Sequence, residues 1–374
     1  MLTSTGGHDP LVRQTWLQRT LHLDGVLLIA LSLLALAGLV ILYSALDGNV
    51  SEVRKQMLRL SVSFGAMLIM AQIPPATLRR WALWLYLAGL IMLIAVLLIG
   101  VGSGAQRWLD FGVLRFQPSE LMKLAIPMMV AFYLSDGTLP PTWRRMLLSL
   151  IIIMVPTALI LRQPDLGTAL LAATSGFAVL FLAGLRWRYL LGAAVAAGVT
   201  APLLWMFGMH GYQRERVLTF LDPERDPLGA GYHIIQSKIA LGSGGTYGKG
   251  WQQGTQSQLE FLPERHTDFI FAVLGEEFGL FGVAVILTLY AFIIGRGLFI
   301  AINAQDTFSR LLAGALALTF FVYVFVNAGM VSGLLPVVGL PLPLISYGGT
   351  SLVTLMAAFG ILMSIHTHRR LWSS

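Results

Sequence analysis

The sequence predicts an all-α polytopic membrane protein with about ten transmembrane helices and one large extracytoplasmic loop between the seventh and eighth helices. Of its 374 residues, 56% are hydrophobic and only 11% are charged, and the mean hydropathy is +0.75. Soluble domains carry roughly 25% charged residues, so this chain could not cover a water-exposed surface. Long apolar runs recur along the chain, and one long polar segment interrupts them. We therefore expect a single transmembrane domain over residues 1–374.

Ten apolar runs are long enough to cross a bilayer, which takes about 20 helical residues for a hydrocarbon core of about 30 Å. The first run follows a polar tail, residues 1–24, that lacks a convincing signal-peptide cleavage pattern, so we expect a retained first helix. The connection between the fifth and sixth runs is very short, and residues 162–167 are expected to form a structural turn. The predicted spans are residues 25–46, 57–74, 81–102, 118–135, 146–162, 166–185, 189–210, 268–294, 311–332 and 342–365.

Basic residues predict the orientation of these spans. Lysine and arginine are enriched in the cytoplasmic loops of membrane proteins. One set of span ends is richer in them than the other, which predicts an even number of spans with both termini in the cytoplasm. The long loop, residues 212–267, is then extracytoplasmic, as are the connectors 103–117 and 333–341. The arginine-rich ends carry Arg13, Arg19, Arg79, Arg80, Arg144, Arg145, Arg186, Arg188, Arg296, Arg310, Arg369 and Arg370.

Net charge and cysteine usage exclude several classes of function. The formal charge of +7 is small for this length and is explained by membrane topology, so nucleic acid is not an expected partner. The chain contains no cysteine, which excludes disulfides, thiolate nucleophiles and cysteine metal sites.

The long polar loop is the first candidate site, because it is far longer than a helix connector requires. It ends in a run of polar residues, and Asp268 follows as the predicted first residue of the eighth span. One interpretation is that Asp268 is a helix N-cap. The other is a general base at the membrane surface, whose pKa is raised by partial desolvation and by Glu264 and Glu260. Glu260, Glu264 and His266 could also bind a divalent cation, although they show no defined ligand spacing.

A second polar set follows the connector 103–117 on the same predicted side. Pro118 suits the first turn of the fourth span, and Glu120 and Lys123 lie on one helical face at i and i+3. A charge deep in lipid costs at least about 2.5–3.5 kcal/mol, so both side chains must face the bundle interior or a wet cavity. They form either an ion pair that fixes helix packing or the lining of a functional cavity, and we favour the cavity.

Two further features concern packing. Glu276 and Glu277 are expected inside the eighth span, where at least one needs a partner on another helix. The stretch 335–343 is rich in proline and glycine and is predicted to be a re-entrant or rim loop, whose backbone must be covered by protein or water.

Six motifs resemble the SEDS family, and they match its elongation-specific members more closely than its division-specific ones. They are GAQRWLDFG at 104–112, RFQPSELMKLA at 115–125, QPDLGT at 163–168, DPLGAGYHIIQSKIALGSGG at 226–245, FLPERHTDFIFAVLGEEFG at 261–279 and PLPLISYGGTS at 341–351. The resemblance covers nearly the whole chain after the N-terminal tail.

The resemblance implies a ten-span peptidoglycan glycosyltransferase of the bacterial cytoplasmic membrane that polymerises lipid II. The family's essential aspartate falls on Asp268, and its fourth-span glutamate and lysine fall on Glu120 and Lys123. The implied partners are a class B penicillin-binding transpeptidase, other proteins of the elongation complex and membrane lipids.

The implied reaction is an inverting displacement at a sugar carbon that carries a lipid pyrophosphate. It needs a base for the acceptor hydroxyl, expected to be Asp268, and positive charge for the departing pyrophosphate. A divalent cation, Mg²⁺ or Mn²⁺, could share that role. Two other functions stay open: a flippase for the same lipid and a non-catalytic scaffold of the elongation complex. The expected substrate-binding residues are Glu120, Lys123, Arg107, Arg214, Arg216, Lys238, Arg265 and His266.

Overall fold

The structure is a computed structural model that describes residues 21–101, 107–110, 112, 115–185, 211–222, 230–259, 261–262 and 264–368, with single positions between 189 and 206. Its helices are α2 Gly25–Ala45, α3 Val50–Gln72, α4 Pro75–Ile99, α5 Pro118–Ser135, α6 Trp143–Leu161, α7 Leu166–Leu182, α9 Gly211–Leu221, α10 Ala230–Ser243, α11 Thr255–Gln258, α12 Ile270–Ile302, α13 Thr307–Val331 and α14 Thr350–Thr367. A small hairpin pairs β1 Leu109–Asp110 with β2 Arg115–Phe116 in antiparallel register.

The helices confirm an all-α membrane protein. In the described residues, six are long and apolar enough to cross a membrane, namely α2, α4, α6, α12, α13 and α14. Helices α3, α5 and α7 also lie where spans are predicted, and α5 has the predicted bounds, 118–135. The predicted seventh span, 189–210, falls largely on residues outside the described part of the chain. The predicted loop 212–267 contains helices α10 and α11 and most of α9.

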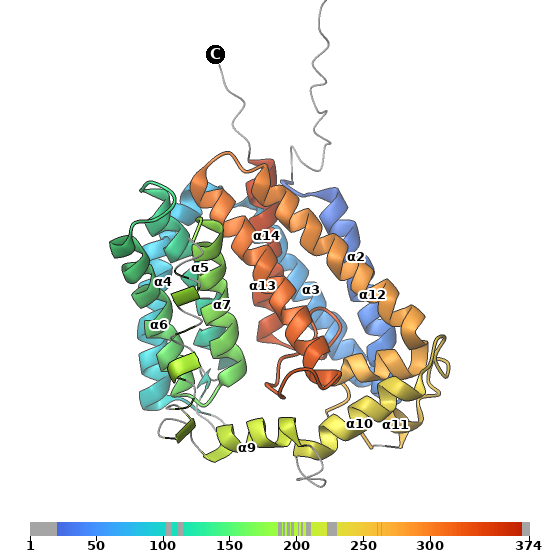
Figure 1. Ribbon diagram of the computed structural model, residues 1–374. Helices are drawn as coiled ribbons and strands as arrows, with labels where there is room; N and C mark the ends of the chain where they lie inside the picture. The colour runs from blue at the N-terminus through green and yellow to red at the C-terminus, as the bar shows by residue number, and fades with distance from the viewer. Residues whose placement is uncertain are drawn as a thin grey trace, which may run out of the picture.

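Helix α13 is central in the bundle. It contacts α12, α7, α5 and α14, while α14 packs along α3 and α12 packs along α2. Figure 1 shows α4 to α7 on one side and α2 with α12 on the other, and α9 to α11 lie across one end. The rings of His22, just before α2, and His368, just after α14, stack with centroids 3.9 Å apart. The two ends of the described chain therefore meet.

Polar side chains cap several of these helices and explain where they begin. Asp24 accepts hydrogen bonds from backbone amides of α2, and Asp165 does the same for α7, so the structural turn expected at 162–167 ends at Asp165 and α7 begins at Leu166. Asn49 caps α3, which begins at Val50 and not at the predicted residue 57. The apolar criterion missed this first part because it is polar, yet a capped helix forms there regardless of hydropathy.

Helix α12 is kinked at Gly279, where φ is 64° and ψ is −164°. A β-carbon at Gly279 would collide with the backbone of residues 246–248, so this close approach requires glycine. The kink leaves backbone N–H and C=O groups of α12 without partners in their own helix, and residues 245–250 form hydrogen bonds with them. Leu280 N donates to Gly245 O at 3.0 Å, and Lys249 N donates to Glu276 O at 3.0 Å. The long loop is therefore hydrogen-bonded into the kink.

Glu276 and Glu277 lie within α12, as predicted for the eighth span, in the short part that precedes the kink. Glu276 accepts from Lys249 Nζ at 2.7 Å and from the backbone amides of Gln256 and Ser257. Glu277 accepts from Ser44 Oγ of α2 at 2.5 Å. Both carboxylates are buried and attach other segments to the start of α12, which confirms their expected packing role.

The last helix begins at Thr350, eight residues after the predicted start at 342. Residues 335–349, here called the proline loop, are not helical, and Leu340 and residues 342–346 are buried, while Gly339 and Gly349 are exposed. Tyr290 Oη of α12 donates to Pro343 O at 2.5 Å, and a β-carbon at Gly38 of α2 would lie 2.5 Å from Leu344 O. Protein thus covers the last part of the predicted loop 335–343.

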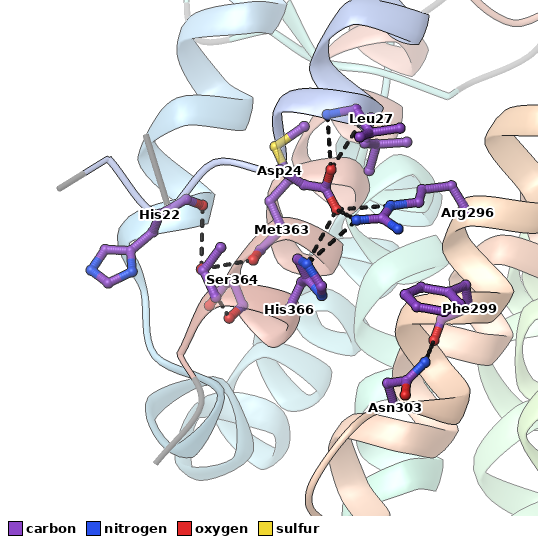
Figure 2. A network of polar contacts seen from close by, with 11 residues as sticks. His22, Asp24, Leu27, Arg296, Phe299, Asn303, Met363, Ser364 and His366 are labelled. Carbon is purple, nitrogen blue, oxygen red and sulfur yellow. Dashed lines mark hydrogen bonds and ion pairs between the residues drawn. The ribbon is translucent and has the colours of Figure 1, made fainter. Parts of the chain in front are cut away.

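An ion-pair network holds three helices together at the end where the chain termini meet. Figure 2 shows Arg296 of α12 and His366 of α14 converging on Asp24 at the start of α2. Arg296 Nη2 lies 2.7 Å from Asp24 Oδ2, and only 1% of the Asp24 side chain is exposed. Asp24 Oδ1 meanwhile accepts from Val26 N and Leu27 N. One carboxylate therefore caps α2 and neutralises Arg296.

Replacing Asp24 by alanine is expected to destabilise the protein by about 3–5 kcal/mol, because it leaves the partly buried Arg296 without its counter-charge. Asp24→Asn should cost less, since an asparagine still caps α2. The measurement is the apparent unfolding temperature of detergent-solubilised protein. Equal unfolding temperatures for wild type and Asp24→Ala would show that the network does not stabilise the bundle.

Candidate functional site

Asp268 lies in a short non-helical segment, residues 264–269, here called the aspartate turn. Helix α12 starts at Ile270, its N-cap position is Phe269, and no side chain caps it. The N-cap interpretation of Asp268 is therefore wrong. Among the described residues, the Asp268 carboxylate has no hydrogen-bond or ion-pair partner, although it is largely buried. Such a carboxylate is available to accept a proton or a substrate hydroxyl.

Burial, and to a smaller extent the nearby Glu264 carboxylate, together raise the pKa of Asp268 to about 6. A group with this pKa is ionised at neutral pH but holds its proton more strongly than an ordinary aspartate. His233 of α10 belongs to the same neighbourhood, because its ring stacks on Phe269 with centroids 5.7 Å apart. Burial lowers the pKa of His233, which favours its neutral form. The aspartate turn thus carries a basic carboxylate, and a neutral imidazole from α10 packs against the same turn.

The proline loop holds the aspartate turn in place. Tyr347 N donates to His266 O at 2.8 Å, and Ser346 Oγ donates to Thr267 O at 2.5 Å. The Asp268 carboxylate lies against Gly339, where a β-carbon would be 3.4 Å from Asp268 Oδ2. Two segments that are distant in sequence therefore build one site, and three consecutive residues of the aspartate turn contact the proline loop.

A cation from α3 reaches the same place. The guanidinium of Arg59 lies 4.2 Å from the centroid of the Tyr347 ring, and the Tyr347 hydroxyl donates to Glu52 Oε2 at 2.8 Å. The His266 ring meets the Tyr347 ring edge-on, with centroids 6.0 Å apart. Arg59 is thus attached to the proline loop, close to the aspartate turn.

Glu120 and Lys123 form the ion pair that the first interpretation predicts, and the Lys123 side chain also borders a cavity. Lys123 Nζ lies 2.7 Å from Glu120 Oε2, and only 6% of each side chain is exposed. Lys123 Nζ also donates to Tyr323 Oη of α13 at 2.5 Å. The cavity lies between α5, α13 and α14, has a volume of about 40 Å³, and includes Lys123 and Tyr323 in its lining. This volume suits a few water molecules.

A second, smaller cavity of about 20 Å³ lies between α13, α14 and the proline loop. Tyr323 and Leu355 line both cavities, and Ser346 of the proline loop lines the second. The first cavity therefore borders Lys123, and the second cavity borders the proline loop that holds the aspartate turn.

The structure separates the other expected substrate-binding cations. Arg107 donates to Pro164 O at 2.6 Å and to Gln163 O, which attaches it to the turn before α7. Arg265 pairs with Asp47 and donates to Ser257 O, so it anchors the long loop to the α2–α3 connection. Arg214 of α9 donates to Met206 O at 3.1 Å.

Lys238 is exposed on α10 and lies over Gly333 at the end of α13. The Arg216 side chain is outside the described part of the chain. Of the candidate residues, Glu264, Arg265, His266 and Asp268 thus lie in the aspartate turn, where Arg265 points to Asp47, while Glu120 and Lys123 share α5.

The expected metal ligands do not assemble a protein site in the described residues, where no group of three histidine or acidic side chains is close enough to hold an ion. Glu264 Oε2 accepts from Thr267 Oγ1 at 2.7 Å and so stabilises its own turn. Glu260 lies outside the described residues. No reaction step is therefore assigned to a metal held by this protein.

Sequence reasoning missed Arg59, Asn327 and Gly339. Asn327 is a polar residue within the apolar stretch of α13, and that contrast was a usable signal. Gly339 has a φ of 70°, but glycine in a proline-rich stretch signals a turn without indicating its neighbours. Arg59 lies in the polar first half of α3, which the apolar criterion assigned partly to a loop.

Comparisons with known proteins agree over nearly the whole chain. Residues 19–371 match the FtsW/RodA/SpoVE family, described as cell cycle protein. The peptidoglycan glycosyltransferase MrdB of Escherichia coli is 55% identical over 353 residues, which cover 94% of this chain and 95% of that protein.

Two solved structures share the fold. A chain from a peptidoglycan synthase complex, described for its coordination of polymerization and crosslinking, aligns with a TM-score of 0.81 and 35% identity, covering 92% of this chain and 97% of that one. The rod shape determining protein RodA of Thermus thermophilus, in a mutant with one aspartate replaced by alanine, aligns with a TM-score of 0.70 and 29% identity over 92% of this chain and 97% of that one.

Proposed function

We propose, from the premise that this chain belongs to the FtsW/RodA/SpoVE family of cell cycle proteins, that Asp268 is the general base of its glycosyl transfer. This is the SEDS family that the sequence motifs resemble, and the chain is a peptidoglycan glycosyltransferase of cell elongation, with RodA and MrdB among its relatives. It is a multi-pass protein of the bacterial inner membrane. The observation that carries the proposal is the largely buried, unpartnered carboxylate of Asp268, with a pKa of about 6.

The reaction joins two lipid-linked saccharides. One is the donor, whose anomeric carbon carries the lipid pyrophosphate, and the other is the acceptor, and lipid II can fill either place. The acceptor 4-hydroxyl attacks the donor anomeric carbon, the bond to the lipid pyrophosphate breaks, and the α-linked donor becomes a β-linked product. Asp268 accepts the hydroxyl proton as the new bond forms, so the hydroxyl becomes nucleophilic without a covalent enzyme intermediate. A carboxylate at the membrane surface suits substrates that are anchored by lipid.

The departing pyrophosphate needs positive charge. We assign this role first to Lys123, which borders the cavity between α5, α13 and α14, with Glu120 holding its position. Arg59 and Lys238 are further candidates, because neither has a carboxylate partner within the described residues. Arg107 and Arg265 are less suited, since backbone carbonyls and Asp47 already engage them.

We propose ten spans, with both termini cytoplasmic and the aspartate turn outside. The stacked His22 and His368 rings support a common side for the two termini. Helices α9 to α11 lie at the other end of the bundle, where α10 contacts α12 (Figure 1). Peptidoglycan is assembled outside the membrane, so an extracytoplasmic site would release its product where the product is used.

A class B penicillin-binding transpeptidase is the proposed partner, and the likeness to a chain of a peptidoglycan synthase complex supports it. Other elongation-complex proteins are proposed to join this pair. Any Mg²⁺ or Mn²⁺ is proposed to bind chiefly to the substrate pyrophosphate, because the described residues offer no group of three ligands.

The test is polymerisation of purified lipid II by the protein co-purified with its transpeptidase, in detergent, with and without a chelator. We expect β-linked glycan from the wild type and none from Asp268→Ala. Wild-type polymerisation by Asp268→Ala would refute the proposed base. A chelator should slow the reaction if the pyrophosphate carries a cation, and unchanged rates would remove the cation from the proposal. Translocation of lipid II in proteoliposomes that survives Asp268→Ala, without glycan synthesis, would favour the flippase.

A further inference from the structure

Asn327 is an unusual residue for its position. It lies near the end of α13, a helix that is otherwise mostly apolar, and its side chain is 0% exposed. A buried amide is unfavourable unless its hydrogen-bonding groups find partners, so its presence needs a structural reason. The reason lies in the two segments that build the site.

The Asn327 side chain joins these two segments. Its Nδ2 donates to Asp268 O at 2.9 Å and to Leu340 O at 2.7 Å. Both acceptors are main-chain carbonyls, which fixes the orientation of the amide, because a flipped amide would turn its oxygen toward two other oxygens. Both bonds come from the same NH₂ group, and they tie the aspartate turn and the proline loop to one rigid helix.

The hydrogen bond from Asn327 is made to Asp268, the residue that carries the proposed base. Asp268 provides both the carbonyl that Asn327 holds and the carboxylate that lies against Gly339, the neighbour of Leu340. The remaining contacts between the two segments involve His266 and Thr267, which bond to Tyr347 and Ser346. Without Asn327, the Asp268 backbone would lose the only side-chain hydrogen bond that it accepts from the residues described here.

We propose that Asn327 is a positioning residue that sets the location and direction of the Asp268 carboxylate by holding its peptide carbonyl. This inference rests on the proposed role of Asp268. Reacting groups must be placed to within a fraction of an ångström, and a misplacement of about 1 Å can lower a rate by about 10²-fold. Asn327 touches neither substrate in this scheme, so its effect falls on turnover and not on substrate binding.

The test compares Asn327→Leu, which keeps the number and branching of side-chain heavy atoms but removes both N–H donors, with Asn327→Ser, whose hydroxyl can donate one hydrogen bond. Ser175→Ala is the control, because Ser175 is equally buried and bonds only Ala172 O of its own helix. Polymerisation of lipid II is measured for each variant in complex with its transpeptidase. The unfolding temperature of the same preparations shows whether a loss of activity reflects unfolding.

We expect Asn327→Leu to lower kcat by about 10²-fold while KM changes less than about threefold. Asn327→Ser should lose less, and Ser175→Ala should match the wild type. A wild-type kcat in folded Asn327→Leu, or a loss that follows the unfolded fraction, would overturn the inference. If Asn327→Leu does not fold, a wild-type kcat in Asn327→Ser overturns it equally.

An Asp268→Asn preparation separates the two proposals. A wild-type rate in Asp268→Asn refutes the general base itself. A strongly reduced rate in Asp268→Asn together with a fully active, folded Asn327→Leu refutes only the positioning role of Asn327.

Discussion

Asp268→Asn protein is expected to polymerise lipid II about 10²- to 10⁴-fold more slowly than the wild type, because it loses the general base of the reaction. The amide has almost the same size as the carboxylate, and the Asp268 carboxylate has no described partner whose loss would disturb the fold. Unfolding temperature and binding to the transpeptidase should therefore stay unchanged. The measurement is the initial rate of glycan formation at saturating lipid II.

The matched control is Asp222→Asn, an exposed carboxylate at the end of α9. It removes one negative charge from the same end of the bundle and should leave the rate unchanged. An equal loss of rate in Asp222→Asn would mean that overall charge, and not proton transfer by Asp268, explains the effect. An unaffected rate in Asp268→Asn would mean that another group accepts the proton.

Lys123→Met is expected to destabilise the protein by about 3–5 kcal/mol, because it leaves Glu120 buried without its counter-charge. It should also lower the polymerisation rate by at least about 10²-fold, by analogy with the loss of one charge-stabilising donor in other active sites. The unfolding temperature and the initial rate, measured on the same preparation, give both quantities.

The double variant Glu120→Gln with Lys123→Met distinguishes a structural pair from a functional one. Replacing both charges removes the unpaired carboxylate, so most of the lost stability should return. The rate should not return, because the positive charge facing the cavity is still missing. Recovery of both stability and rate would show that the pair only fixes the packing of α5.

Local features of this protein were predictable from sequence where one short pattern decides them. The bounds of α5 follow from Pro118 at its first turn and from the apolar run behind it. The spacing of Glu120 and Lys123 places them on one helical face, and the ion pair of 2.7 Å confirms it. The same holds for the structural turn before α7, which the very short connection between the fifth and sixth apolar runs predicts.

Features that depend on distant partners were not predictable in this way. The kink at Gly279 needs the turn 245–250 packed against it, and hydropathy cannot report that contact. Asn327 and Asp268 are 59 residues apart in sequence, and Arg296 and Asp24 are 272 apart. The start of α14 at Thr350 was misplaced because the proline loop is apolar enough to resemble a span. Apolar composition identifies burial, but it does not distinguish a helix from a covered loop.

The pH dependence of a single turnover is the most direct test that Asp268 accepts the acceptor proton. Since burial raises the pKa of Asp268 to about 6, its basic form is present above that pH and disappears as the pH falls below it. Between about pH 5 and pH 8, the wild-type rate should be level at high pH and approach a tenfold decrease per pH unit below about 6, while the residual rate of Asp268→Asn should lack this decrease. A wild-type rate that is level over the whole range, or the same decrease in Asp268→Asn, would contradict a general base at Asp268.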